Sequence, residues 1–173
     1  LIRTLPNQAK IFIDYAHTPN ALETALKTLK EHYNINPDVV FGCGGERDKK
    51  KRPIMAKVSE KYAENIYLTD DNPRNESPKL IRQMIMLGFK KRKNIKIIPS
   101  RSKAIATAII NSKPNGIILV AGKGHETIQI YKNKILNSSD KMMIKMINTD
   151  QIKSRKKNYN QILNAEIMYK LTK

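Results

Sequence analysis

Short apolar runs alternate along this chain with longer segments that are apolar only at helical spacing. Short runs with an apolar middle are typical of buried strands, and segments apolar every three or four residues are typical of amphipathic helices. The strands predicted in this way are 10–14, 38–41, 66–69, 95–98 and 117–121. The helices predicted between them are 18–32, 53–62, 77–87 and 101–109.

This alternation predicts an α/β fold of the Rossmann-like type, with a mostly parallel sheet and helices on both faces. Residues 127–131 and 134–136 flank Lys132-Asn133 and predict an antiparallel hairpin at the sheet edge. Methionines and Ile147 near the end of this region predict one more packing helix. We therefore expect residues 1–150 to form one domain, followed by a basic C-terminal helix or tail over residues 151–173.

Polar loops follow four of the five predicted strands. They are 14–17, 42–52, 70–74 and 122–126, and they carry most of the glycines and mixed charges. The carboxyl ends of parallel strands lie at one edge of a sheet, which is where ligands bind in open α/β folds. The sequence therefore predicts that these four loops converge on one binding site.

The chain is strongly basic, with 33 Lys and Arg against 15 Asp and Glu and a net charge of +18. This charge raises the alternative of a basic module that binds nucleic acid or another polyanion. However, most of the excess is lysine spread over helices and turns, without an aromatic RNA-binding motif or a helix-turn-helix signature. We expect no nucleic-acid partner.

The single cysteine excludes an internal disulfide and fits a reducing cytoplasm, and no apolar run is long enough for membrane insertion.

Simple phosphate and metal motifs are missing from the loops. The glycines at 42–45 follow the second strand and lack the third glycine of a dinucleotide fingerprint, and the phosphate loop Gly-x-x-x-x-Gly-Lys-[Ser/Thr] is absent. Three histidines and one cysteine offer no zinc-ligand spacing. We therefore assign no metal ligand and no catalytic residue to this chain.

Taken together, the four loops resemble the C-terminal domain of the Mur ligases. The matching motifs appear in the family's order over residues 10–140: Asp14-Tyr-Ala-His-Thr-Pro19, Phe41-Gly-Cys-Gly-Gly-Glu-Arg-Asp48 with Lys51-Arg-Pro53, Thr69-Asp-Asp-Asn-Pro-Arg74, and Val120-Ala-Gly-Lys-Gly-His-Glu126. The third motif resembles the version that recognises meso-diaminopimelate rather than lysine. The chain departs from the family pattern at Glu46, usually Asp, at Lys50, usually Gly, and in the segment 137–141.

The resemblance implies a role in peptidoglycan precursor synthesis. An ATP-dependent ligase of this family adds meso-diaminopimelate to UDP-N-acetylmuramoyl-L-alanyl-D-glutamate through an acyl phosphate. ATP and Mg²⁺ would be bound mainly by upstream domains of the same ligase, as would the UDP-muramoyl dipeptide. This domain would deliver the amino acid.

The resemblance also implies which residues form the site. The diaminopimelate site would comprise Arg47, Asp71, Asn72, Pro73, Arg74, Gly122 and Glu126. Residues facing the nucleotide would be Asp14, Tyr15 and His17, with Asp14 suited to ribose hydroxyls.

Physical chemistry supports diaminopimelate over the alternative of a lysine-adding ligase. An arginine binds a carboxylate in a bidentate fork. Lysine as substrate has no distal carboxylate, so Arg74 would be left without a partner, which is costly when it is buried. A folylpolyglutamate-type ligase is a further alternative with a similar architecture, but it has no evident need for the Asp-Asn-Pro-Arg loop.

Overall fold

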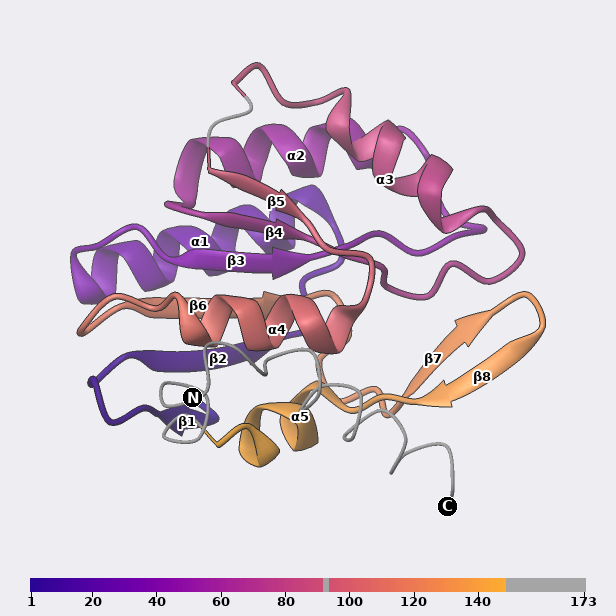
Figure 1. Ribbon diagram of the computed structural model, residues 1–173. Helices are drawn as coiled ribbons and strands as arrows, with labels where there is room; N and C mark the ends of the chain where they lie inside the picture. The colour runs from indigo at the N-terminus through magenta and orange to yellow at the C-terminus, as the bar shows by residue number, and fades with distance from the viewer. Residues whose placement is uncertain (92–93, 149–173) are drawn as a thin grey trace.

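A computed structural model describes residues 1–91 and 94–148. Its main sheet has six strands in the order β1-β2-β6-β3-β4-β5, and only β1 runs antiparallel to its neighbour. Figure 1 shows this sheet with helices around it. The strands are β1 (Arg3–Thr4), β2 (Lys10–Asp14), β3 (Asp38–Phe41), β4 (Ile66–Leu68), β5 (Ile95–Ile97) and β6 (Ile117–Ala121).

The helices begin where short polar side chains can cap them. Thr18 caps α1 through a bond from the Ala21 N–H (3.2 Å), and Ser77 and Ser100 accept similar bonds at α3 and α4. Prolines stand in the first turns of α1 and α3, where no backbone donor is lost. The helices are α1 (Pro19–Tyr33), α2 (Lys51–Tyr62), α3 (Pro78–Met86), α4 (Arg101–Ile110) and α5 (Asp140–Met146).

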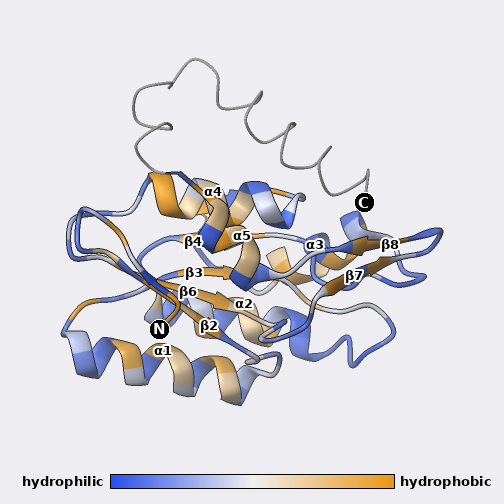
Figure 2. Ribbon diagram, turned by 90° about the horizontal axis from the view of Figure 1, so that it is seen from below, coloured by the Kyte–Doolittle hydropathy of each residue, from blue (hydrophilic) through white to orange (hydrophobic). Residues whose placement is uncertain are grey.

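The helices cover both faces of the sheet, and α1 and α4 lie on opposite sides of the apolar strands in Figure 2. Alternate residues of β3 supply the two cores, since Val39 and Phe41 pack with α1, α2 and α3, whereas Val40 packs with α4 and α5. The central strand β6 is buried along its whole length. This arrangement confirms the predicted α/β class with helices on both faces.

The predicted hairpin is also present, as β7 (Ile128–Tyr131) and β8 (Lys134–Asn137). Its strands pair with each other in a separate two-stranded sheet. One isolated bridge, between Arg74 and Tyr131, joins it to the loop after β4. Figure 1 shows the hairpin projecting beyond the carboxyl ends of the parallel strands, beside the predicted site.

Two local details differ from the sequence prediction. Helix α2 begins at Lys51 instead of Pro53, so the proline occupies its first turn. The short strand β1 was not predicted, because two residues leave no readable period. The predicted tail, residues 151–173, lies outside the described residues.

Candidate functional site

The four polar loops meet at the carboxyl edge of the sheet, as predicted. Backbone bonds join them in pairs: the Gly45 N–H donates to the Asn72 carbonyl (2.9 Å), and the Gly122 N–H donates to the Asp14 carbonyl (3.1 Å). A side-chain bond from Asn72 Nδ2 to Glu126 Oε2 (2.8 Å) links the second pair to the first. The loops thus form one connected surface.

Arg74 occupies the middle of this surface in a constrained geometry. Its backbone is left-handed, with φ of 52°, and its N–H donates to the Ile130 carbonyl of the hairpin (3.0 Å). Its Nη1 donates to the carbonyls of Gly45 (2.8 Å) and Asn72 (3.3 Å). The side chain is half-buried, and its hydrogen bonds to other described residues use Nη1 alone, which leaves its other N–H groups available to an anion.

Asn72 is buried and has both ends of its amide occupied. Its Nδ2 donates to Glu126, and its Oδ1 accepts from the Ile130 N–H (2.9 Å). Since a carboxylate accepts and a backbone N–H donates, these partners define which end is oxygen. Asn72 therefore fixes the Glu126 carboxylate relative to Arg74.

Two hairpin residues that the sequence prediction missed support the same loop. Gln129 is buried, and its Nε2 donates to the carbonyls of Asp71 (2.6 Å) and Asp70 (3.2 Å). The Tyr131 hydroxyl donates to Asp70 Oδ2 (3.2 Å). A polar residue within the apolar alternation of β7 was the only available signal for Gln129.

The adjacent carboxylates Asp70 and Asp71 are both buried. Asp70 pairs with Arg82 of α3, and Asp71 Oδ1 accepts from the Asn72 N–H (2.7 Å). Burial raises the pKa of both carboxyl groups, against the opposing effects of Arg82 on Asp70 and Arg101 on Asp71. The Asp71 side chain thus supports its own loop from beneath. Pro73, in the same loop, is also buried.

The loop after β6 contributes Gly122 and Glu126. Gly122 has φ of 110°, and a Cβ there would lie 2.7 Å from Asp71 Oδ2. Lys123 is fully buried, and its Nζ donates to the Ile128 carbonyl and lies 3.5 Å from Glu126 Oε2. Glu126 keeps about a third of its side chain exposed (30%), so its carboxylate is accessible.

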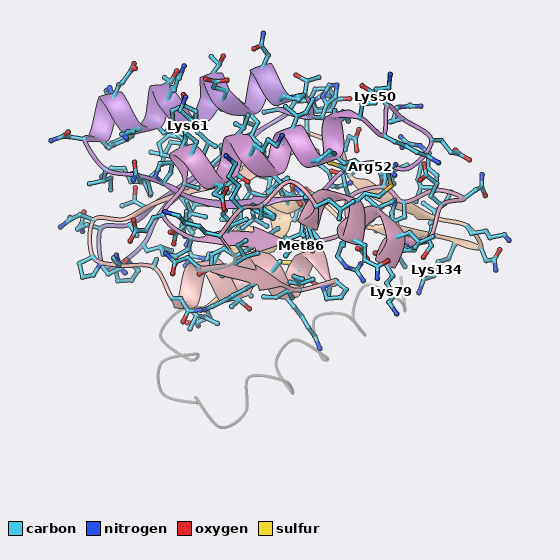
Figure 3. The ribbon with its side chains drawn as sticks, turned by 90° about the horizontal axis from the view of Figure 1, so that it is seen from above. Lys50, Arg52, Lys61, Lys79, Met86 and Lys134 are labelled. Atoms are coloured by element: carbon cyan, nitrogen blue, oxygen red, sulfur yellow. The ribbon has the colours of Figure 1, made fainter. Side chains whose placement is uncertain are left out.

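Basic side chains surround this end of the molecule. Arg47 is exposed, its Nη1 donates to the Glu46 carbonyl (3.1 Å), and its Cγ lies 3.7 Å from an ideal Cβ on Gly44. Arg74 Nη1 lies 3.0 Å from that same point, so the two arginines flank Gly44. Figure 3 shows Lys50, Arg52, Lys79 and Lys134 at this end and Lys61 at the other.

The predicted nucleotide-facing residues lie on the neighbouring loop after β2. The rings of Tyr15 and His17 pack edge to face with centroids 4.6 Å apart, and the His125 ring lies 5.8 Å from Tyr15. Asp14 is exposed, and its Oδ1 accepts from the Ala16 N–H (2.8 Å). Lys51 of α2 donates to the His17 carbonyl (2.7 Å) and ties this loop to the one after β3.

Two arginines to which the sequence analysis assigned no role in the site, Arg52 and Arg101, are completely buried beneath these loops. Arg52 forms a fork with Glu76, with Nη1–Oε2 and Nη2–Oε1 distances of 3.0 Å, and its Nη2 also donates to the Gly44 carbonyl (3.2 Å). Arg101 pairs with Asp140 of α5 in the same bidentate way. Both pairs hold strand-end loops to the helices behind them.

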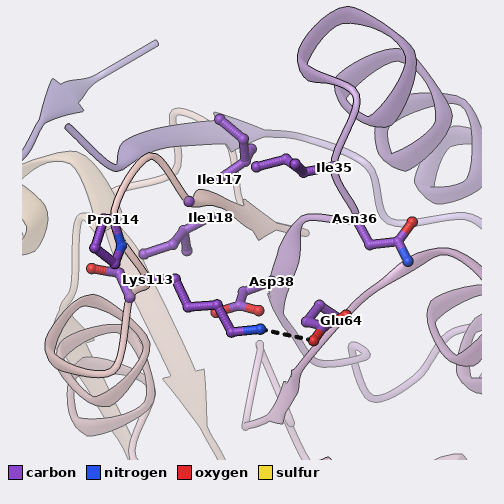
Figure 4. Close-up of a pocket in the computed structure, with 10 residues that line it drawn as sticks. Ile35, Asn36, Asp38, Glu64, Lys113, Pro114, Ile117 and Ile118 are labelled. Carbon is purple, nitrogen blue, oxygen red and sulfur yellow. Dashed lines mark hydrogen bonds and ion pairs between the residues drawn. The ribbon is translucent and has the colours of Figure 1, made fainter. Parts of the chain in front are cut away.

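A cavity of about 290 Å³ lies at the opposite edge of the sheet, where β3 and β6 begin. Ile35, Ile117 and Ile118 supply its apolar wall, and an ion pair between Lys113 and Glu64 (3.0 Å) is drawn across it in Figure 4. None of the predicted site residues lines this cavity. The predicted site and this cavity therefore lie at opposite edges of the sheet.

Residues 1–91 and 94–148, which the structure describes, were compared with the requirements of a membrane-spanning helix and of a metal site. No helix within these ranges has the length and apolarity needed to cross a membrane. The same ranges contain no group of three His, Cys, Asp or Glu side chains placed to hold a metal ion.

The sequence of the chain matches a known family of α/β domains. The family model described as Mur ligase, glutamate ligase domain, matches residues 1–124, so the chain is a member of that family. This result confirms the resemblance found in the motifs.

Several similar proteins carry the name of one particular ligase. The UDP-N-acetylmuramoyl-L-alanyl-D-glutamate–2,6-diaminopimelate ligase of Buchnera aphidicola (subspecies Schizaphis graminum) is 49% identical over 139 residues, which cover 80% of this chain and 28% of the relative. The ligase of that name from Haemophilus influenzae is 48% identical over 135 residues, covering 78% and 28%. A solved structure of a ligase with this name matches with a TM-score of 0.75 and 36% identity, over 79% of this chain and 28% of the other. The chain thus spans less than a third of these relatives.

Gly44 and Gly45 allow the packing of the loop after β3 against the loop after β4 to be tested. We expect Gly45→Ala to lower the free energy of unfolding by about 3 kcal/mol, because the new Cβ would lie 1.9 Å from the Pro73 carbonyl oxygen. Gly44→Ala is the control, since its nearest neighbour is a side-chain atom, Arg74 Nη1 at 3.0 Å, which can shift a few tenths of an ångström more cheaply than backbone. Urea unfolding of both variants measures the difference, and equal losses would contradict the packing described.

Proposed function

We propose that this chain is the amino-acid-binding domain of an ATP-dependent ligase that adds meso-diaminopimelate to UDP-N-acetylmuramoyl-L-alanyl-D-glutamate. One observation supports this most directly: the half-buried Arg74 guanidinium is held between two backbone carbonyls on a loop that also orients Glu126. Diaminopimelate carries an ammonium and a carboxylate at each end. A site with an arginine and a glutamate in one connected loop system matches one such end.

Each predicted contact has a physical reason. Arg74, flanked by Arg47 across Gly44, would bind the distal carboxylate through its free N–H groups. Glu126 and the Gly122 carbonyl would accept from the distal ammonium. Asn72 and Asp71 would act mainly by holding these groups in place, because both are buried and bonded within the loop.

The other substrates would be bound chiefly outside this chain. ATP and the UDP-muramoyl dipeptide would occupy upstream domains of the same ligase, because the phosphate-loop motif is absent from this chain. Mg²⁺ would be bound mainly by the same upstream domains. Asp14, Tyr15 and His17 would approach the nucleotide from the edge of this domain. Cytoplasmic location is part of the same proposal.

The proposal predicts discrimination against lysine. Lysine would leave the Arg74 guanidinium without an anion in a half-buried position, and an unpaired charged group of this kind costs several kcal/mol. We therefore expect a preference for diaminopimelate of at least about a hundredfold in kcat/KM.

A chimera tests the function. The matched region of the Haemophilus influenzae ligase, 48% identical, would be replaced by this chain, and tripeptide formation would be measured with diaminopimelate and with lysine. We expect turnover with diaminopimelate. A chimera that binds ATP normally but uses lysine better, or neither amino acid, would contradict the proposal.

A further inference from the structure

The Arg101 side chain is the most enclosed charge at the carboxyl edge. It is the first residue of α4, and its side chain has no exposed surface. Its Nε and Nη2 donate to the two oxygens of Asp140, at 2.8 and 2.6 Å, and Nη2 also donates to the Ala121 carbonyl (2.9 Å). Asp140 is itself completely buried. The pair therefore joins α4, α5 and the end of β6.

One nitrogen of this guanidinium is not satisfied. Nη1 is buried and has no hydrogen bond, and its nearest acidic partner is Asp71 Oδ2 at 3.9 Å. A buried donor without an acceptor is costly, so an approach of the Asp71 carboxylate would be favourable. Asp140 occupies Nε and Nη2 of the guanidinium, which leaves the Nη1 N–H groups directed toward Asp71.

Asp71 connects Arg101 to the surface of the site. Its Oδ1 accepts from the Asn72 N–H (2.7 Å), and its Oδ2 faces Gly122, where a Cβ would lie at 2.7 Å. Arg101 also reaches the Ala121 carbonyl, directly before Gly122. It therefore contacts both loops that would hold the amino acid, from below and without facing the ligand.

We propose that Arg101, anchored by Asp140, is a positioning residue for the amino-acid site: it holds the Asp71 side chain and the end of β6 from below, and thereby sets the Asn72 backbone and the Gly122 face. This inference rests on the proposed function. It assigns to the first residue of α4 a role that the motifs of the strand-end loops do not contain.

The charges around Asp71 determine the expected pH dependence. Burial raises its pKa, Arg101 from α4 and Lys123 from the loop after β6 oppose that effect, and Glu126 adds to it. Cys43, on the loop after β3, is close enough to Asp71 for its own pKa to be raised by that carboxylate, but burial is the larger cause of its shift. If Arg101 is replaced by an uncharged residue, the pKa of Asp71 rises further. Asp71 is then protonated at a higher pH, so amino-acid binding should be lost at a higher pH than in the unsubstituted protein.

The experiment uses the chimeric ligase with Arg101→Lys, which keeps the charge but not the fork, and Arg101→Met, which removes both. We expect Arg101→Lys to raise the KM for diaminopimelate about tenfold, as the loss of one charge-assisted bond implies, with the KM for ATP unchanged. In Arg101→Met, the rise of the KM for diaminopimelate that accompanies a fall in pH should begin at a higher pH. Adding Asp71→Asn should abolish that shift.

A matched control separates positioning from general packing. Ile105→Ala removes a buried side chain one turn along α4 and should lower the melting temperature without changing the KM for diaminopimelate. If Arg101→Met does not fold, Arg101→Lys and Asp71→Asn still decide the question. An unchanged KM and pH profile in Arg101→Lys would overturn the inference. If the unsubstituted chimera does not use diaminopimelate, the proposed function fails instead.

Discussion

Arg74→Ala is expected to lower kcat/KM for diaminopimelate by about a thousandfold, equivalent to about 4 kcal/mol of lost binding in the transition state. In the proposed complex, the variant would remove a fork of charge-assisted bonds and leave the distal carboxylate of the substrate unpaired in a partly buried site. Arg74→Lys keeps the charge without the fork, so its kcat/KM should lie between those of the unsubstituted protein and Arg74→Ala. Steady-state kinetics of the chimeric ligase, with diaminopimelate varied at saturating ATP, measures the effect.

Two controls make the Arg74 result specific. Lys79→Ala removes one positive charge from an exposed position at the same end of the molecule (Figure 3) and should leave kcat/KM nearly unchanged. The KM for ATP should be the same in all these variants. Normal turnover of diaminopimelate by Arg74→Ala would remove the recognition argument altogether.

Arg52→Met is expected to lower the free energy of unfolding by about 3 kcal/mol, because it removes the charge-assisted fork to Glu76 and the donor to the Gly44 carbonyl. Glu76 is 20% exposed and keeps the Glu46 N–H and Lys49 as partners, so the loss is smaller than for a fully buried pair. Arg52 has no exposed surface, and its fork to Glu76 holds the Gly44 carbonyl as well. Denaturant unfolding of the whole chain measures the loss. Lys113→Met, which removes the exposed pair with Glu64 at the opposite edge, is the matched control and should change stability little.

The same pair predicts a dependence on acid. Arg52 lowers the pKa of Glu76 from 4.5 to about 2, so the folded value lies below the unfolded one. The stability from this carboxylate is therefore fully present above about pH 4.5 and is lost as the pH falls toward about 2. Arg52→Met should show much less of this acid-dependent loss. An unchanged acid dependence would show that another group causes it.

Most element boundaries were predictable because the signals are local. Thr18 and Ser77 cap helices within three residues of themselves, and the apolar runs of β2, β3 and β6 are short and continuous. The convergence of the loops was predictable as well, since parallel strands bring their carboxyl ends to one edge. The packing faces of the helices were less predictable: Leu80 and Leu87 fit the helical period but are largely exposed.

The buried charges were not predictable. Arg52 stands within a matching motif and Arg101 begins a predicted helix, but neither position indicates that the side chain is fully enclosed. Their partners Glu76 and Asp140 lie 24 and 39 residues away along the chain. No periodic pattern connects residues at such separations. Only the packing of α2 and α3 on one face of the sheet, and of α4 and α5 on the other, brings them together.

The sequence by itself determined the α/β class, the order of strands and helices, and the loops at one edge of the sheet. Those properties depend on short-range periodicity and on turn chemistry, which adjacent residues carry. The tertiary structure alone decided that Gln129 and Tyr131 of the hairpin hold the loop of Arg74, and that two buried arginines lie beneath the site. Contacts of this kind depend on how separate elements pack, and a buried charge acquires its partner only when the chain has folded.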